Sequence, residues 1–140
     1  MHFAGPVGGG DARIHAVGPR ASADTVANGA GERLVALCRD QELLILNGRL
    51  PGDEGGALTF HALGRKADSQ VDYHIASPAL VFDAEGVPRP GVALQVHALS
   101  TCPNRPRGGR GGRTGAYDHC PVVLTLGDWA QGEAAPRAHV

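Results

Sequence analysis

The chain has 140 residues, a length that suffices for one domain with a modest hydrophobic core, and its formal net charge is −1. Hydrophobic residues make up 42% of it, while 21 glycines and 10 prolines predict a layout rich in loops. The near-neutral charge excludes a globally basic nucleic-acid binder, so any affinity for phosphate must come from a local patch.

Cysteine usage and hydropathy exclude further classes. Cys38, Cys102 and Cys120 are odd in number and widely spaced, which favours neither a disulfide framework nor a zinc site. The sequence predicts neither a signal peptide nor a membrane span. We therefore expect an intracellular protein, nuclear or cytoplasmic, without a membrane partner.

The first forty residues predict one principal helix. Residues 1–8 are expected to be a disordered tail, and residues 14–26 a polar loop. Asn28 can cap a helix over roughly residues 29–40, with acidic Glu32 near its start and basic Arg39 near its end. The apolar positions of this helix, at helical spacing, are Leu34, Leu37 and Cys38.

Five segments have the composition and alternation of strands. The first is a continuous apolar run, predicted to be fully buried and to end at Asn47-Gly48. A shorter element is expected at residues 80–82. Together with the helix, these segments predict an α/β (α+β) fold with a mostly antiparallel sheet. The five predicted strands are Leu43–Leu46, Leu58–Phe60, Val71–Ala76, Val92–Ala98 and Val122–Leu126.

Residues 101–116 form the most unusual segment, because arginines recur among glycine and proline. Such a tract is expected to be a flexible loop that captures a nucleic-acid backbone by charge. Alternatively, it is a solvated insertion, since Lys66 is the sole lysine and the bias toward arginine fits GC-rich coding. Residues 131–140 are expected to be a disordered tail. The arginines considered for nucleic-acid binding are Arg105, Arg107, Arg110 and Arg113.

Two stretches carry candidate chemistry. Asp118 and His119 stand at the mouth of the last predicted strand, where a carboxylate suits Mg²⁺ and an imidazole can hold a phosphate oxygen. A solvated turn is the alternative for this pair. Asp72 lies inside a predicted strand, where aspartate is disfavoured and needs a partner, unless it marks a bulge or an edge.

These stretches resemble motifs of one superfamily. Asp118-His119-Cys120-Pro121 before a hydrophobic strand, the segment 69–75 and Gly9-Gly10-Asp11-Ala12-Arg13 are similar to three motifs of the endonuclease/exonuclease/phosphatase superfamily, in that family's order. Residues 28–60 further resemble endonuclease domains attached to retroelement reverse transcriptases. The resemblance implies that residues 9–130 are the C-terminal half of a two-sheet β-sandwich flanked by helices.

The resemblance also implies a mechanism. In it, Asp72 hydrogen-bonds His119, which steadies the charge that develops on a scissile phosphate. Asp11 orients the attacking water, and Asp118 and Asp11 contribute to a site for Mg²⁺, or for Mn²⁺ in its place. From the residues alone, Asp11 is as well explained by a glycine turn with one acid.

Three departures from the family's pattern lead to three hypotheses. No asparagine follows Asp11, Tyr117 stands where serine is usual, and nothing matches the N-terminal half with its metal-binding glutamate. The chain is then a truncated, retroelement-derived endonuclease domain, inactive unless the missing half or a self-associating partner completes it. Alternatively, it is a non-catalytic nucleic-acid-binding remnant, with DNA expected ahead of RNA, or a non-functional pseudogene product.

Overall fold

A computed structural model of the chain describes residues 10–61, 68–98 and 119–127. It confirms the α+β class. The predicted tails and the predicted arginine-rich loop lie outside the described residues. The helices are α1 (Ala12–Val17), α2 (Gly29–Asp40) and α3 (Pro78–Val81), and the strands are β1 (Leu44–Ile45), β2 (Ile75–Ala76), β3 (Val92–Val96) and β4 (Val122–Leu126).

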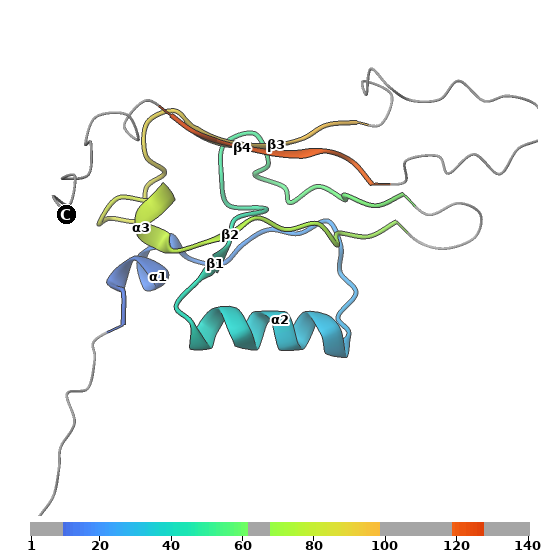
Figure 1. Cartoon of the computed structure of the whole chain (residues 1–140), viewed down its shortest axis with the longest axis horizontal. Helices are drawn as coiled ribbons and strands as arrows, with labels where there is room; N and C mark the ends of the chain where they lie inside the picture. The colour runs from blue at the N-terminus through green and yellow to red at the C-terminus, as the bar shows by residue number, and fades with distance from the viewer. Residues whose placement is uncertain (1–9, 62–67, 99–118, 128–140) are drawn as a thin grey trace, which may run out of the picture.

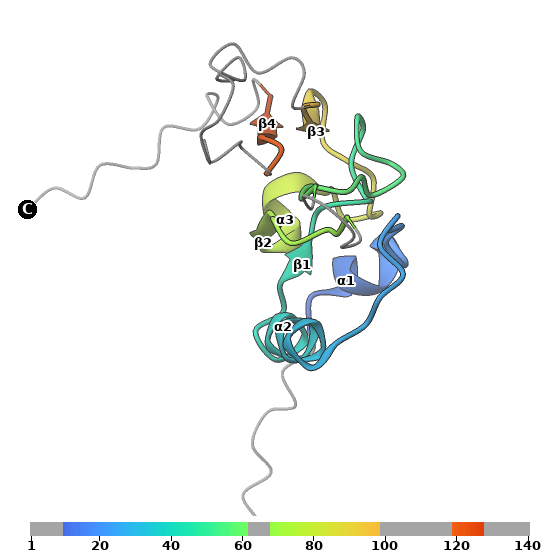
Figure 2. The same cartoon turned by 90° about the vertical axis from the view of Figure 1, so that its right-hand side faces the viewer.

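The elements are stacked in three tiers (Figure 1). β3 and β4 form one antiparallel pair, β1 and β2 form another, and α2 lies beyond β1 on the side away from β3 and β4. The view turned by 90° places α1 and α3 in the middle tier beside β1 and β2 (Figure 2). Among the described residues the strands therefore form two separate two-stranded ladders rather than the single sheet that the sequence predicted.

The hydrophobic core fills the space between the two ladders. Its fully buried members come from the segments around β1, α3 and β3, and half-buried side chains of α1 and β4 pack against them. The alternation of apolar residues in β3 produces this packing, because every second side chain points to the same face. The buried core residues are Leu44, Leu46, Leu50, Val81, Phe82, Val92 and Leu94.

The last predicted strand is confirmed with its predicted bounds. β4 pairs antiparallel with β3 in a register that sets Leu124 opposite Leu94. Val123 and Thr125 face solvent, as the alternation predicts, but the inward side chains are half-buried rather than buried. β3 ends at Val96, two residues earlier than predicted, and the ladder continues through the hydrogen bond from His97 N to Pro121 O at 2.9 Å.

The principal helix is also confirmed. Asn28 Oδ1 accepts hydrogen bonds from the backbone N–H groups of Ala30 at 3.1 Å and Gly31 at 3.0 Å. Cys38 is buried, as expected, and burial raises the pKa of its thiol. Leu37, which shares the helical spacing of Leu34 and Cys38, is 55% exposed. α2 is packed against β1 on the Cys38 side, and among the described residues nothing covers the Leu37 side.

Two stretches predicted to be loop or undefined are helical. The prediction of a loop over residues 14–26 is wrong at its start, because α1 extends to Val17. Asp11 is the N-cap of α1, and its side chain accepts a hydrogen bond from Arg13 N. α3 begins with Pro78 at its first turn, where the missing N–H of proline costs nothing. Short helices of this kind depend on tertiary packing, which the sequence pattern does not contain.

Three other predicted strands are shorter than expected. Of residues 43–46 only Leu44–Ile45 form a strand, and of residues 71–76 only Ile75–Ala76, with Val71 49% exposed. In the segment 58–60, Phe60 makes isolated bridges to Ser69 and His119 rather than a continuous ladder. The side chain of Thr59 there is fully buried, whereas its apolar neighbours Leu58 and Phe60 are half-buried, so the apolar alternation does not mark the more buried face.

The predicted turn after β1 is confirmed at Gly48. Its φ of 75° lies in the left-handed region that favours glycine. A Cβ atom there would lie 1.8 Å from the carbonyl oxygen of Ala21. The turn is fixed further by the buried carboxylate of Asp53, which accepts from Gly48 N at 3.1 Å and from Ala57 N at 2.7 Å.

Candidate functional site

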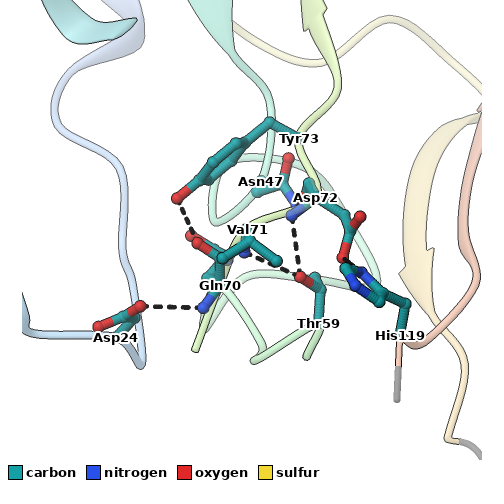
Figure 3. A network of polar contacts seen from close by, with 8 residues as sticks. All are labelled: Asp24, Asn47, Thr59, Gln70, Val71, Asp72, Tyr73 and His119. Atoms are coloured by element: carbon teal, nitrogen blue, oxygen red, sulfur yellow. Dashed lines mark hydrogen bonds and ion pairs between the residues drawn. The ribbon is translucent and has the colours of Figure 1, made fainter. Parts of the chain in front are cut away.

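Asp72 and His119 meet across the fold. His119 Nδ1 lies 2.8 Å from Asp72 Oδ2 (Figure 3), which confirms the hydrogen bond predicted from the sequence. Because a carboxylate accepts hydrogen bonds, this contact assigns a proton to Nδ1. In the neutral imidazole, Nε2 then carries no proton. The side chains are 51% exposed for His119 and 38% for Asp72, so the pair stands at the surface.

Phe60 supports the imidazole from the side. Its ring meets the His119 ring edge-on, with centroids 5.0 Å apart and an interplanar angle of 64°. The two residues also form an antiparallel bridge through their backbones. The neighbouring residue His61 forms a second imidazole–carboxylate contact, with Nδ1 2.8 Å from Asp68 Oδ2. His61 is therefore a partly exposed histidine with a carboxylate partner.

Thr59 holds the segment that carries Asp72. Its hydroxyl Oγ1 accepts the backbone N–H groups of Val71 and Asp72, each at 3.0 Å (Figure 3). Its carbonyl oxygen accepts from Cys120 N at 2.6 Å, directly after His119. Thr59 thus contacts the chain on both sides of the imidazole–carboxylate pair.

Asn47 holds the same segment from its other side. The Asn47 Nδ2 amide donates to the carbonyl oxygen of Asp72 at 3.1 Å, and its Oδ1 accepts from His74 N at 3.0 Å. Asn47 and Thr59 both have 0% exposure. Both backbone polar groups of Asp72 are therefore bonded to buried side chains, which restricts where its carboxylate can point.

Beside this segment lies a second buried polar group, Gln70, at 2% exposure. Its side chain donates to Ala57 O at 2.9 Å and accepts from Arg20 Nη1 at 2.7 Å. Its backbone carbonyl accepts the Tyr73 hydroxyl, and its backbone N–H donates to Asp24 Oδ2 at 2.9 Å (Figure 3). That N–H, followed by the N–H of Val26 and the charge of Arg20, lowers the pKa of the Asp24 carboxyl.

The structure does not bring Asp11 to the pair. Asp11 caps α1 and holds Arg13, whose Nη1 lies 3.3 Å from Asp11 Oδ1. α1 packs beside α3 at the left in Figure 1, whereas His119 precedes β4, whose start lies at the right. Asp118 and the four arginines considered for nucleic-acid binding lie outside the described residues.

Three clefts formed by the described residues border α2 rather than the pair. One of about 450 Å³ lies between the N-terminus of α2 and the segment 68–73, with Leu34, Gln70 and Tyr73 in its walls. Neither Asp72 nor His119 lines it. In residues 10–61, 68–98 and 119–127, no three histidine, cysteine, aspartate or glutamate side chains gather as metal ligands. Within those ranges, no helix has the length and apolar character to cross a membrane.

No protein-family model, curated protein or solved structure matches the chain. The resemblance to the endonuclease/exonuclease/phosphatase superfamily therefore stays a prediction from its motifs. The geometry adds two residues that the sequence reading did not assign to the site, Asn47 and Thr59. A signal existed for each: an asparagine that ends a buried apolar run, and a threonine between two large apolar residues, are polar groups that need partners.

Proposed function

We propose that the chain carries the imidazole–carboxylate part of a Mg²⁺-dependent phosphodiesterase site of the endonuclease/exonuclease/phosphatase type, and that this chain alone does not hydrolyse its substrate. The observation that carries the proposal is the 2.8 Å contact between Asp72 and His119, which the motif match predicts from residues 47 positions apart. An accidental match of short motifs gives no reason for these two side chains to meet.

The exposure of the pair supports a polymeric phosphodiester as the substrate. Small-molecule sites are usually enclosed, whereas the His119 side chain is about half exposed and lines none of the clefts that border α2. A DNA backbone can approach such a surface, where the protonated imidazolium form of His119, supported by Asp72, donates from Nε2 to a phosphate oxygen as charge develops there. In this proposal the ladders belong to a two-sheet sandwich in a retroelement-derived endonuclease of the nucleus or cytoplasm.

The proposed inactivity follows from an incomplete set of carboxylate ligands for the metal ion. Mg²⁺ binds weakly to a lone protein carboxylate without substrate phosphates. The structure holds Asp11 at α1 with Arg13, away from Asp72. The remaining ligands, for Mg²⁺ or Mn²⁺, would come from Asp118 and from a further segment or self-associating partner. Positioned metal ions supply much of the rate in phosphoryl transfer, so an incomplete set leaves binding without cleavage.

The first test titrates the chain with a short DNA duplex and Mg²⁺ while the histidine side-chain signals are followed by NMR. We expect the signals of His119 to move and those of His15, an exposed histidine in α1, to stay. Supercoiled plasmid with Mg²⁺ or Mn²⁺ should show no nicking beyond that of His119→Ala. Unmoved His119 signals would contradict the proposed site, and nicking that His119→Ala abolishes would contradict the proposed inactivity.

A second candidate is a non-catalytic DNA-binding remnant that uses the arginine-rich segment. It is favoured by the four arginines that precede His119 in the sequence. In this case binding persists without any change at His119, and replacing all four arginines with glutamine makes the dependence of affinity on salt shallower. The same titration, repeated at several salt concentrations, separates the two candidates. The arginines replaced are Arg105, Arg107, Arg110 and Arg113.

A further inference from the structure

We propose that Thr59 is the positioning residue of the Asp72–His119 pair. This inference rests on the proposed function, since it concerns the same site. Its support is the set of contacts that Thr59 makes, and its test does not require enzymatic activity. Thr59 has 0% exposure and lies between Leu58 and Phe60, in a segment that pairs on one side with Ser69 and on the other with the chain at His119.

Thr59 binds the segment that carries Asp72 and the segment that carries His119 through different atoms. Its side-chain Oγ1 accepts from Val71 N and Asp72 N, each at 3.0 Å, and so fixes the backbone from which the carboxylate projects. Its main-chain oxygen accepts from Cys120 N at 2.6 Å and so fixes the residue directly after the imidazole. Because one residue contacts both segments, a shift at Thr59 changes the distance between Asp72 and His119.

The chemistry of threonine suits this role. A hydroxyl has two acceptor lone pairs, and here two N–H groups use them. The branched Cβ restricts χ1, so the hydroxyl is held where the two N–H groups converge. Serine keeps the acceptor, while valine keeps the shape and removes the acceptor of the part-buried N–H groups of Val71 and Asp72. These two substitutions therefore separate the hydrogen bonds from the packing.

The tautomer of His119 reports the position of the pair. In the native geometry Asp72 Oδ2 accepts from Nδ1, which selects the Nδ1–H form of the neutral ring. If the Asp72 segment moves, that selection is lost and the ring reverts toward the form that it adopts in Asp72→Ala. A residue that served only the stability of the fold would lower the unfolding midpoint without changing the tautomer.

The experiment records long-range ¹H–¹⁵N correlations of the imidazole in the full chain above the titration range of histidine. We expect the Nδ1–H form to dominate in the parent and in Thr59→Ser. In Thr59→Val the signals should move toward those of Asp72→Ala. Val81→Ala, a truncation in the core at α3, controls for lost stability and should retain the parent tautomer.

A folded Thr59→Val with the parent tautomer would overturn the inference. If Thr59→Val does not fold, Thr59→Cys replaces it, because a thiol fills similar space and is a weak acceptor. A parent tautomer in folded Thr59→Cys would overturn the inference equally. Since DNA is absent from the measurement, a tautomer that responds to Thr59 supports this inference even where the DNA titration fails.

Discussion

At the residue scale, Asp24 shows how a carboxylate far from the pair supports the same segment. Its Oδ1 accepts from Val26 N and its Oδ2 from Gln70 N, each at 2.9 Å. These N–H groups favour the charged form and lower the pKa of the Asp24 carboxyl from its ordinary value of 3.8. The Gln70 contact joins the loop before α2 to the residues that lead to Asp72.

The lowered pKa gives a direction to the dependence of stability on pH. A carboxyl whose pKa is lower in the folded state stabilises that state above its unfolded pKa, and this contribution is lost as pH falls through the folded value. We expect the loss of unfolding free energy in Asp24→Asn to be largest near neutral pH and to shrink below about pH 4. Urea unfolding across this range measures it. A difference that does not shrink on acidification would refute the assignment.

The resemblance to the superfamily's motifs allowed the Asp72–His119 contact to be predicted, whereas the residues alone indicated only that Asp72 needed a partner or marked a bulge or an edge. It did not assign Thr59 or Asn47 to the site. Their importance depends on which side chains are buried, and the alternation at residues 58–60 indicated the wrong face. Asp11 was interpreted as a catalytic aspartate, whereas aspartate before a helical segment is equally a capping signal.

At the scale of elements, α2 is the longest of the described helices, and one side chain caps its start. Asn28 Oδ1 satisfies two of the N–H groups that have no partner within the helix. We expect Asn28→Ala to lower the unfolding free energy by about 1 kcal/mol, and Asn28→Ser to lower it much less. Chemical denaturation followed by circular dichroism makes the comparison. Equal losses in both variants would show that the cap is not what stabilises the helix.

The elements that sequence reasoning recovered are those with strong local patterns. The capped helix α2 and the alternating strands β3 and β4 combine apolar periodicity with a defined start. α1, α3 and the short ladder of β1 and β2 were missed or overestimated. They have between two and six residues, and at that length contacts distant in sequence decide the conformation.

At the scale of the whole molecule, apolar side chains are distributed unevenly. The core between the ladders is closed, whereas α2 and the loop before it expose Val26, Val35 and Leu37 at 73%, 53% and 55%. Val26 and Val35 line one cleft beside α2, whereas Leu37 points to a different side of the helix, because residues two apart do not share a face. Replacement of the exposed Leu37 should therefore change association more than stability.

We expect Leu37→Lys to change the unfolding free energy by less than about 0.5 kcal/mol and to reduce self-association in light scattering. Leucine and lysine have similar helix propensity, and a cation suits the last turns of a helix. Leu46→Ala, in the closed core, should cost about 2–5 kcal/mol. If Leu37→Lys destabilised the chain as much as Leu46→Ala, the Leu37 side of α2 would have to be covered.

The way the site is assembled has a consequence for folding. The contact of Asp72 with His119 closes a loop of 47 positions, and that of His74 Nε2 with Val122 O one of 48, while Asn47 reaches Asp72 across 25. Loop-closure entropy delays such contacts until local structure such as α2 is in place. The imidazole–carboxylate pair therefore belongs to the last native contacts that form. Separation of β4 from β3 would remove His119 from Asp72 while leaving α2 intact.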